Sequence, residues 1–255
     1  MNLFDIMGLV STVAMALPVI ALIVSKLAWY RSFPALLFYY VLVLSYATIQ
    51  LGYINTSGDY RYYHGVVCNF LDTPLILLFL HYFGKTTYFR KRLQIAAFVF
   101  IAFEIIVIAM YGFNTQATTI VLAPGLVLTL VISLFFFIHQ VKISVVYHKA
   151  AGKAVMISAL LFAYVGYCFV YVVYYLIKPV YKDDAHLVYF LITIVSSTAM
   201  SVGIYLEKSR VRQLAELKTT RNELKAIYRE EREGNKMTAP NEAVILNFDK
   251  KQWSQ

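Results

Sequence analysis

Seven nearly uncharged stretches, each about twenty residues long, occupy the sequence between residues 6 and 206. The hydrocarbon core of a bilayer is about 30 Å thick, so a helix that rises about 1.5 Å per residue needs about 20 apolar residues to cross it. Segments of this length must be helical, because lipid offers no hydrogen-bond partners to the backbone. The predicted spans are 6–25, 35–54, 65–84, 94–113, 119–140, 154–177 and 186–206. The sequence therefore predicts an all-α transmembrane domain of seven helices over residues 1–206.

The composition indicates the same environment. Hydrophobic residues make up 60% of the 255 residues and charged residues only 15%, against roughly a quarter charged in soluble domains. One bundle of this size uses most of the chain, and the connections between its spans are short. We expect an integral protein of a bacterial inner (plasma) membrane, with the lipid bilayer as its first partner.

Lysine and arginine residues are distributed unequally between the two ends of the predicted spans. One end collects Lys26, Arg31, Lys85, Arg90, Lys91, Arg92, Lys142, Lys149, Lys153 and the C-terminal segment. The other end has Arg61, Lys178 and Lys182. The positive-inside rule then predicts an N-terminus outside and a C-terminus in the cytoplasm. We interpret the net charge of +9 as this topology signal together with attraction to anionic lipid, not as nucleic-acid binding.

The composition changes abruptly after the seventh span. Residues 207–233 are densely charged, and their apolar residues recur at roughly helical spacing: Val211, Leu214, Leu217, Leu224 and Ile227. This spacing predicts a cytoplasmic amphipathic helix that continues the last span. It is either a solvated juxtamembrane helix or a stalk for a homo-oligomer or a cytoplasmic partner; Arg221 interrupts the apolar seam that a coiled coil requires. Residues 234–255 are polar and predict a flexible tail.

Two carboxyl groups lie inside the predicted spans, where burying an ionisable group is costly and usually functional. Asp72 belongs to the third span, with Asn69 one turn before it, and Glu104 belongs to the fourth. Either group could carry a proton or anchor a ligand, and either could instead be a hydrogen-bonded structural acid. The sequence predicts Asp72, Asn69 and Glu104 as candidate site residues.

The sixth span carries a face of tyrosines, formed by Tyr164, Tyr167, Tyr171, Tyr174 and Tyr175 at steps of mostly three and four residues. Such a face can line a cavity for a planar apolar ligand, or it can be ordinary interior packing. Hydroxyl residues in the seventh span, Thr198 among them, can complete such a cavity or serve close helix packing. Both interpretations stay open, and we take Tyr164, Tyr167, Tyr171 and Thr198 as candidates.

A run in the third span, DTPLILL at 72–78, is similar to the Thr-Thr-Pro-Leu-Leu-Leu run of microbial rhodopsins, and VSST at 195–198 resembles their seventh helix in outline. That family attaches retinal to a lysine in the middle of the seventh helix, where this chain has Thr198 or Ala199. Cys68 stands at the family's counterion position, and tyrosines replace its paired tryptophans in the sixth helix. The resemblance implies a rhodopsin-like bundle, but without the amine no Schiff base forms, so covalent retinal is not expected. The sequence does not identify any other cofactor.

An enzyme is the less favoured interpretation. Membrane-embedded zinc hydrolases hold their metal with three histidines, and here no three histidines converge plausibly. Ser45 and Asp72 alone do not make such a site, so we predict no catalytic or metal-binding residues.

These patterns predict a receptor-like or sensory membrane protein, in which a cavity between the third, sixth and seventh helices acts on the cytoplasmic helix. The alternative is a proton-coupled or small-solute transporter that uses Asp72 and Glu104.

Overall fold

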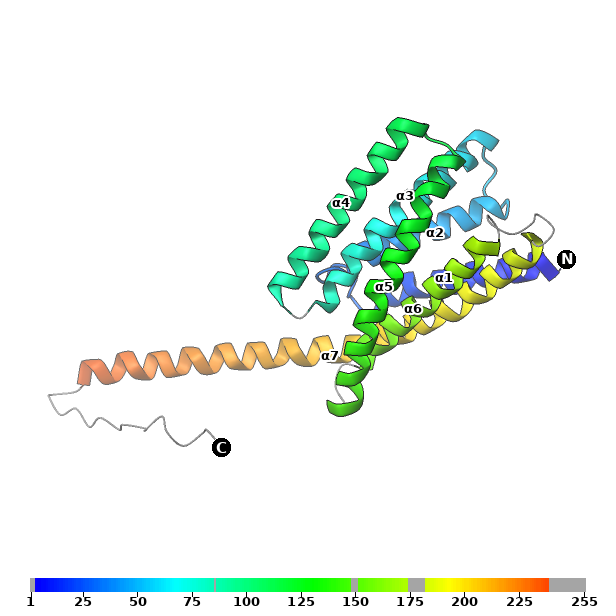
Figure 1. The fold of residues 1–255 in the computed structure, drawn as a ribbon. Coiled ribbons are helices and arrows are strands. Elements are labelled where there is room, and N and C mark those ends of the chain that lie inside the picture. Colours follow the sequence, from blue (N-terminus) through cyan, green and yellow to red (C-terminus); the bar gives the residue numbers. More distant parts are fainter. Residues whose placement is uncertain (1–2, 85, 148–150, 174–181, 239–255) are drawn as a thin grey trace. The chain divides into compact units, whose positions relative to one another are not determined.

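The computed structural model describes residues 3–84, 86–147, 151–173 and 182–238, and these residues form helices and short connections without a strand (Figure 1). The helices are α1 (Leu3–Val24), α2 (Phe33–Gln50), α3 (Gly58–Leu80), the short 3-10 helix η1 (His81–Phe83), α4 (Thr87–Tyr111), α5 (Thr115–Tyr147), α6 (Ala151–Tyr171) and α7 (Lys182–Thr238). The prediction of an all-α fold is confirmed for this part of the chain.

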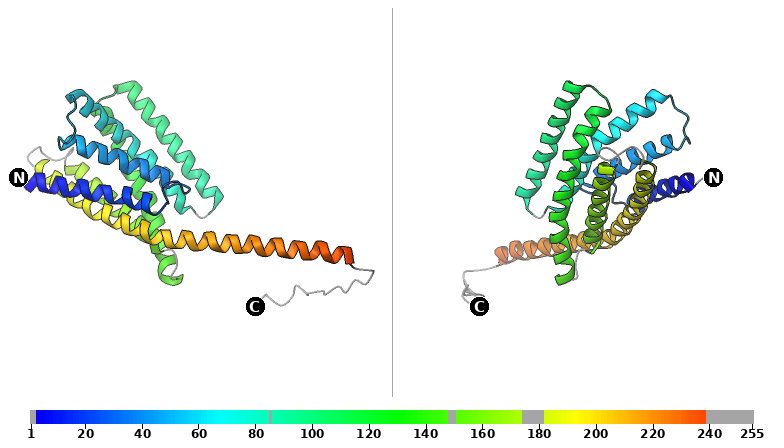
Figure 2. Two further views of the ribbon diagram at one scale, coloured as in Figure 1. Left: turned by 180° about the vertical axis from the view of Figure 1, so that it is seen from behind. Right: turned by 45° about the vertical axis from the view of Figure 1, so that its right-hand side comes forward.

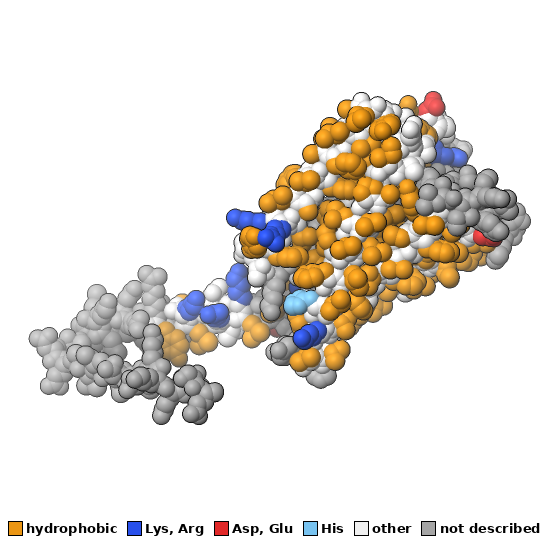
Figure 3. All heavy atoms as spheres, viewed as in Figure 1, with side chains coloured by type: hydrophobic (Ala, Val, Ile, Leu, Met, Phe, Trp, Pro, Cys, Tyr) orange, Lys and Arg blue, Asp and Glu red, His pale blue; other side chains and the backbone are white. Residues whose placement is uncertain are grey.

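Each of the seven α-helices contains a segment long and apolar enough to cross a membrane. Large hydrophobic side chains on α4 are exposed: Phe98 by 69%, Ile105 by 61% and Met110 by 71%. Figure 3 shows hydrophobic side chains covering the face over α4 and α5, while lysine and arginine side chains gather towards the helix ends. A bilayer accounts for this surface, because apolar side chains exposed all along a helix favour lipid as their surroundings. The expected integral membrane protein is supported by these helices.

Helix α3 lies at the centre of the contacts, because it packs against α2, α4 and α5. Helix α4 lies at an edge of the bundle in each ribbon view (Figures 1 and 2). Helix α6 packs on α5, and α7 approaches α6 closely at Gly152 and Gly203. Small residues at such crossings let two backbones come together in lipid.

Short polar signals set several helix ends. Ser57 and Thr86 precede α3 and α4, and their hydroxyl oxygens accept hydrogen bonds of 3.3 Å from the backbone N–H groups of Tyr60 and Phe89. Such N-caps satisfy donors that a helix start leaves unpaired. Gly112 follows α4 with a φ of 78°, a left-handed conformation that glycine adopts without steric cost.

The chain divides into two compact units, residues 1–210 and residues 211–255. Helix α7 is continuous from Lys182 to Thr238, so it covers the segment 207–233 and also residues 234–238, where the sequence predicts the start of the tail. Residues 239–255 lie outside the described part of the chain. In the second unit, the described side chains from Arg212 to Ala226 are exposed.

Candidate functional site

Asp72 lies inside the bundle with tyrosines from two other helices as its polar partners. The Tyr164 hydroxyl of α6 donates a hydrogen bond of 2.8 Å to Asp72 Oδ2. The Tyr39 hydroxyl of α2 is a second partner of the same carboxyl group. Both tyrosines are buried: Tyr164 has no exposed surface, and Tyr39 is 8% exposed. Three helices therefore meet at this carboxyl group.

A cavity of about 550 Å³ extends along α3 to Asp72. Gly65, Cys68, Asn69 and Asp72 line it and recur at the spacing of one helix face. Their separation along α3 corresponds to a depth of about 10 Å, or two helical turns. Residues of α1, α2, α5, α6 and α7 complete the lining, whereas α4 contributes none of the lining residues described.

The lining is rich in tyrosine. Tyr39, Tyr46, Tyr167, Tyr171 and Tyr189 all contribute to it. The rings of Tyr167 and Tyr189 lie 5.6 Å apart between their centroids, and the Tyr171 hydroxyl donates a hydrogen bond of 3.2 Å to the Thr119 carbonyl. Two members of the predicted tyrosine face, Tyr174 and Tyr175, lie outside the described residues.

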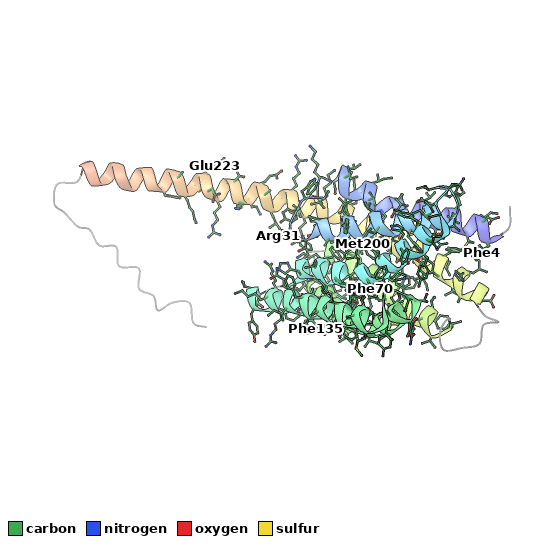
Figure 4. The ribbon with its side chains drawn as sticks, turned by 90° about the horizontal axis from the view of Figure 1, so that it is seen from above. Phe4, Arg31, Phe70, Phe135, Met200 and Glu223 are labelled. Atoms are coloured by element: carbon green, nitrogen blue, oxygen red, sulfur yellow. The ribbon has the colours of Figure 1, made fainter. Side chains whose placement is uncertain are left out.

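The cavity runs from one end of the bundle towards its middle. Phe4 is among its lining residues, and Figure 4 places Phe4 and Arg31 at opposite ends of the bundle, with Met200 and Phe70 between them. A second, much smaller cavity of about 20 Å³ lies beside Tyr164, Tyr167 and Met200, which is room for about one water molecule. Thr193, Ser196 and Ser197 of α7 line this smaller cavity.

Two of the predicted site residues lie apart from both cavities. Thr198 faces outwards, exposed, and its hydroxyl donates to the Ile194 carbonyl at 2.7 Å. Glu104 on α4 is buried at 6% exposure, and its Oε1 has no hydrogen-bond partner in the described structure. The structure thus brings five of the predicted site residues together. Asp72, Asn69, Tyr167 and Tyr171 line the larger cavity, and Tyr164 lines the smaller one.

Sequence reasoning does not find a buried charged cluster that consists of Tyr82, Lys153, Glu207 and Arg210, called the Glu207 cluster below. Glu207 has no exposed surface; it accepts hydrogen bonds from Arg210 Nε, at 2.9 and 3.0 Å to its two oxygens, and from the Tyr82 hydroxyl. Lys153 at the start of α6 places its Nζ 4.2 Å from the Tyr82 ring centroid. The only sequence signal was a carboxylate next to the last span with an arginine three residues later. Tyr82 carries no sequence signal, and Lys153 contributes only to the topology signal.

No three histidine, cysteine, aspartate or glutamate residues gather into a metal-binding group within the described residues. Comparisons with protein-family models, curated proteins and solved structures give no match to this chain.

Proposed function

We propose that this protein is a receptor-like membrane sensor, in which a ligand enters the larger cavity, which Asp72 lines, and changes the position of α7. The cavity of about 550 Å³ is the observation that carries the proposal. Its volume falls within the range of about 300 to 1,000 Å³ that small-molecule sites occupy. Its apolar and aromatic lining with few convergent polar groups also fits such a site.

Helix α7 supplies the link to the cytoplasm. Ala185, His186, Tyr189 and Phe190 of α7 line the cavity, and Glu207 lies about 25 Å further along the same helix. A ligand that displaced these lining residues would move a helix that the Tyr82 hydroxyl of η1 contacts at Glu207. Coupling between two sites requires such an element with two arrangements. The basic ends of α4 and α6 support a cytoplasmic location for the Glu207 cluster.

The test fills the cavity through a native side chain. Cys68 lines the cavity, and a Cys168→Ala variant leaves it as the only cysteine of the chain. Reaction of Cys68 with a benzyl methanethiosulfonate places an aromatic group in the cavity. We expect a several-fold change in amide hydrogen exchange over residues 200–226, measured by mass spectrometry in lipid nanodiscs.

The matched control modifies the other cysteine. In a Cys68→Ala variant the same reagent reacts with Cys168, which belongs to α6 but is not among the cavity-lining residues. This modification should leave exchange over residues 200–226 unchanged. Equal exchange before and after Cys68 modification would refute the coupling.

A second candidate function, a proton-coupled carrier, is favoured by one observation: the buried Glu104 Oε1 has no partner in the described structure. A carboxyl group in that position is suited to hold a proton. Asp72→Asn separates the two functions in vesicles, because a carrier loses pH-dependent solute uptake with this substitution and a receptor shows no uptake in either form.

A further inference from the structure

We infer that the larger cavity, which Asp72 lines, binds an organic monocation, such as an amine or a quaternary ammonium group attached to an apolar body. This inference rests on the proposed function, because it names the ligand class of the same cavity. It begins from the charges of the lining. Asp72 is the only carboxylate among the described lining residues; none of these residues is lysine or arginine, and His186 of α7 is their only histidine.

A carboxylate inside a membrane protein needs compensation. Hydrogen bonds from tyrosine hydroxyls stabilise a negative Asp72, and Tyr164 donates such a bond at 2.8 Å. They bring no positive charge, and an unpaired charge in an apolar interior remains costly. The side of Asp72 that faces the cavity therefore favours a ligand with one positive charge.

The tyrosines fit the same ligand. A cation within about 6 Å of an aromatic ring centre is attracted by the negative face of the ring, and the attraction increases where water is excluded. Tyr39, Tyr46, Tyr167 and Tyr189 all line the cavity. Tyr39 is a hydrogen-bond partner of Asp72, and Tyr46 lies beside Gly65, two helical turns from Asp72 along α3. A carboxylate together with aromatic rings recognises a charged head and tolerates an apolar remainder.

The size of the cavity distinguishes an organic cation from a metal ion. A volume of about 550 Å³ far exceeds a single ion, and the described residues hold no group of three metal-ligating side chains. Asn69 and Gln50 add uncharged polar groups to the lining, which suit a ligand with a further hydrogen-bonding group.

The test uses the full chain in nanodiscs of phosphatidylglycerol, a lipid without an amine. Benzyltrimethylammonium is the cationic probe, and benzyl alcohol and phenylacetate are its neutral and anionic counterparts. By isothermal titration we expect the cation to bind at least tenfold more tightly than either counterpart. Asp72→Asn should weaken its binding at least tenfold, and Asp72→Glu should retain it. Asp59→Asn, which removes an exposed carboxylate from the first turn of the same helix, should change nothing.

A second arm identifies the source of the cation. Lysophosphatidylcholine, compared with lysophosphatidylglycerol, presents the same quaternary ammonium on a lipid. Asp72-dependent binding of either quaternary ammonium probe supports the inference, and the probe that binds shows whether the source is a free molecule or a lipid headgroup. The inference is overturned if neither quaternary ammonium probe binds, or if benzyl alcohol and phenylacetate bind as tightly as benzyltrimethylammonium. Because the comparison of probes uses the unsubstituted protein, misfolding of a variant cannot produce this result. The Cys68 experiment tests the proposed function separately, since it needs no cation.

Discussion

At the scale of single residues, Asp72 organises the polar interior of the bundle. Its carboxyl group accepts a hydrogen bond from Tyr164 and has Tyr39 as a further partner. These contacts make it a structural acid as well as a candidate ligand anchor. The two roles are compatible, because Asp72 also lines the larger cavity. Its structural contribution can be measured without a ligand.

Tyr164→Phe should lower the free energy of unfolding by about 0.6 to 2 kcal/mol, because it removes one hydroxyl donor from the Asp72 carboxyl group while keeping the ring. Unfolding by sodium dodecyl sulfate in mixed micelles measures the change. Tyr205→Phe is the control, since Tyr205 on α7 is 71% exposed and should lose almost nothing. Similar losses in both variants would show that the Tyr164 hydroxyl contributes little.

At the scale of elements, the contact between α6 and α7 connects the cavity side of the bundle to the Glu207 cluster. A Cβ added to Gly152 would lie 2.6 Å from the Glu207 backbone nitrogen and 2.9 Å from its Cα. These neighbours are backbone atoms, so the helices must separate to accept a larger residue. The absence of a side chain at Gly152 is therefore what allows Glu207 to reach its buried position.

Gly152→Ala should destabilise the bundle by about 1 to 3 kcal/mol, the usual cost of overpacking, and should increase hydrogen exchange around Glu207. Thermal unfolding in nanodiscs and exchange mass spectrometry provide the two measurements. Gly58→Ala is the control, because an added Cβ at this first residue of α3 meets no heavy atom within 4 Å. A Gly152→Ala variant as stable as the unsubstituted protein would contradict the tight crossing.

At the scale of the whole molecule, the described bundle carries apolar side chains along its flanks and charges towards its ends. The segment before α4 and the start of α4 belong to the basic end, with Arg90, Lys91 and Arg92. The loop between α2 and α3 belongs to the opposite end, because α3 crosses from one to the other. From the positive-inside rule we expect the basic end to lie in the cytoplasm.

Single cysteines test this orientation in a background with Cys68→Ala and Cys168→Ala. The substitutions are Ile54→Cys, at a position between α2 and α3, and Lys91→Cys, at a position in the first turns of α4. Both positions are exposed. In intact cells a membrane-impermeant maleimide should label Ile54→Cys at once and Lys91→Cys only after permeabilisation. The reverse pattern would invert the proposed topology.

The length and apolar character of the spans are local properties of the chain, and they suffice to determine seven helices suited to a bilayer. The tyrosine spacing likewise placed Tyr164, Tyr167 and Tyr171 on one side of α6. The rotation of each helix about its axis depends on the neighbours it packs against, and no local pattern carries that information. Thr198 and Ser197 are adjacent in sequence, yet Ser197 is 2% exposed and Thr198 faces outwards.

Contacts between distant residues show the same division. Asp72 and Tyr164 are 92 residues apart, and Tyr82 and Glu207 are 125 apart, so neither pair could be recognised from spacing. The sequence by itself determined the helices and their suitability for a bilayer, and it singled out the carboxylate in the third span as a candidate. Only the tertiary structure decided which side chains surround that carboxylate, the volume of the cavity beside it and the burial of Glu207, because each depends on which helix faces come together.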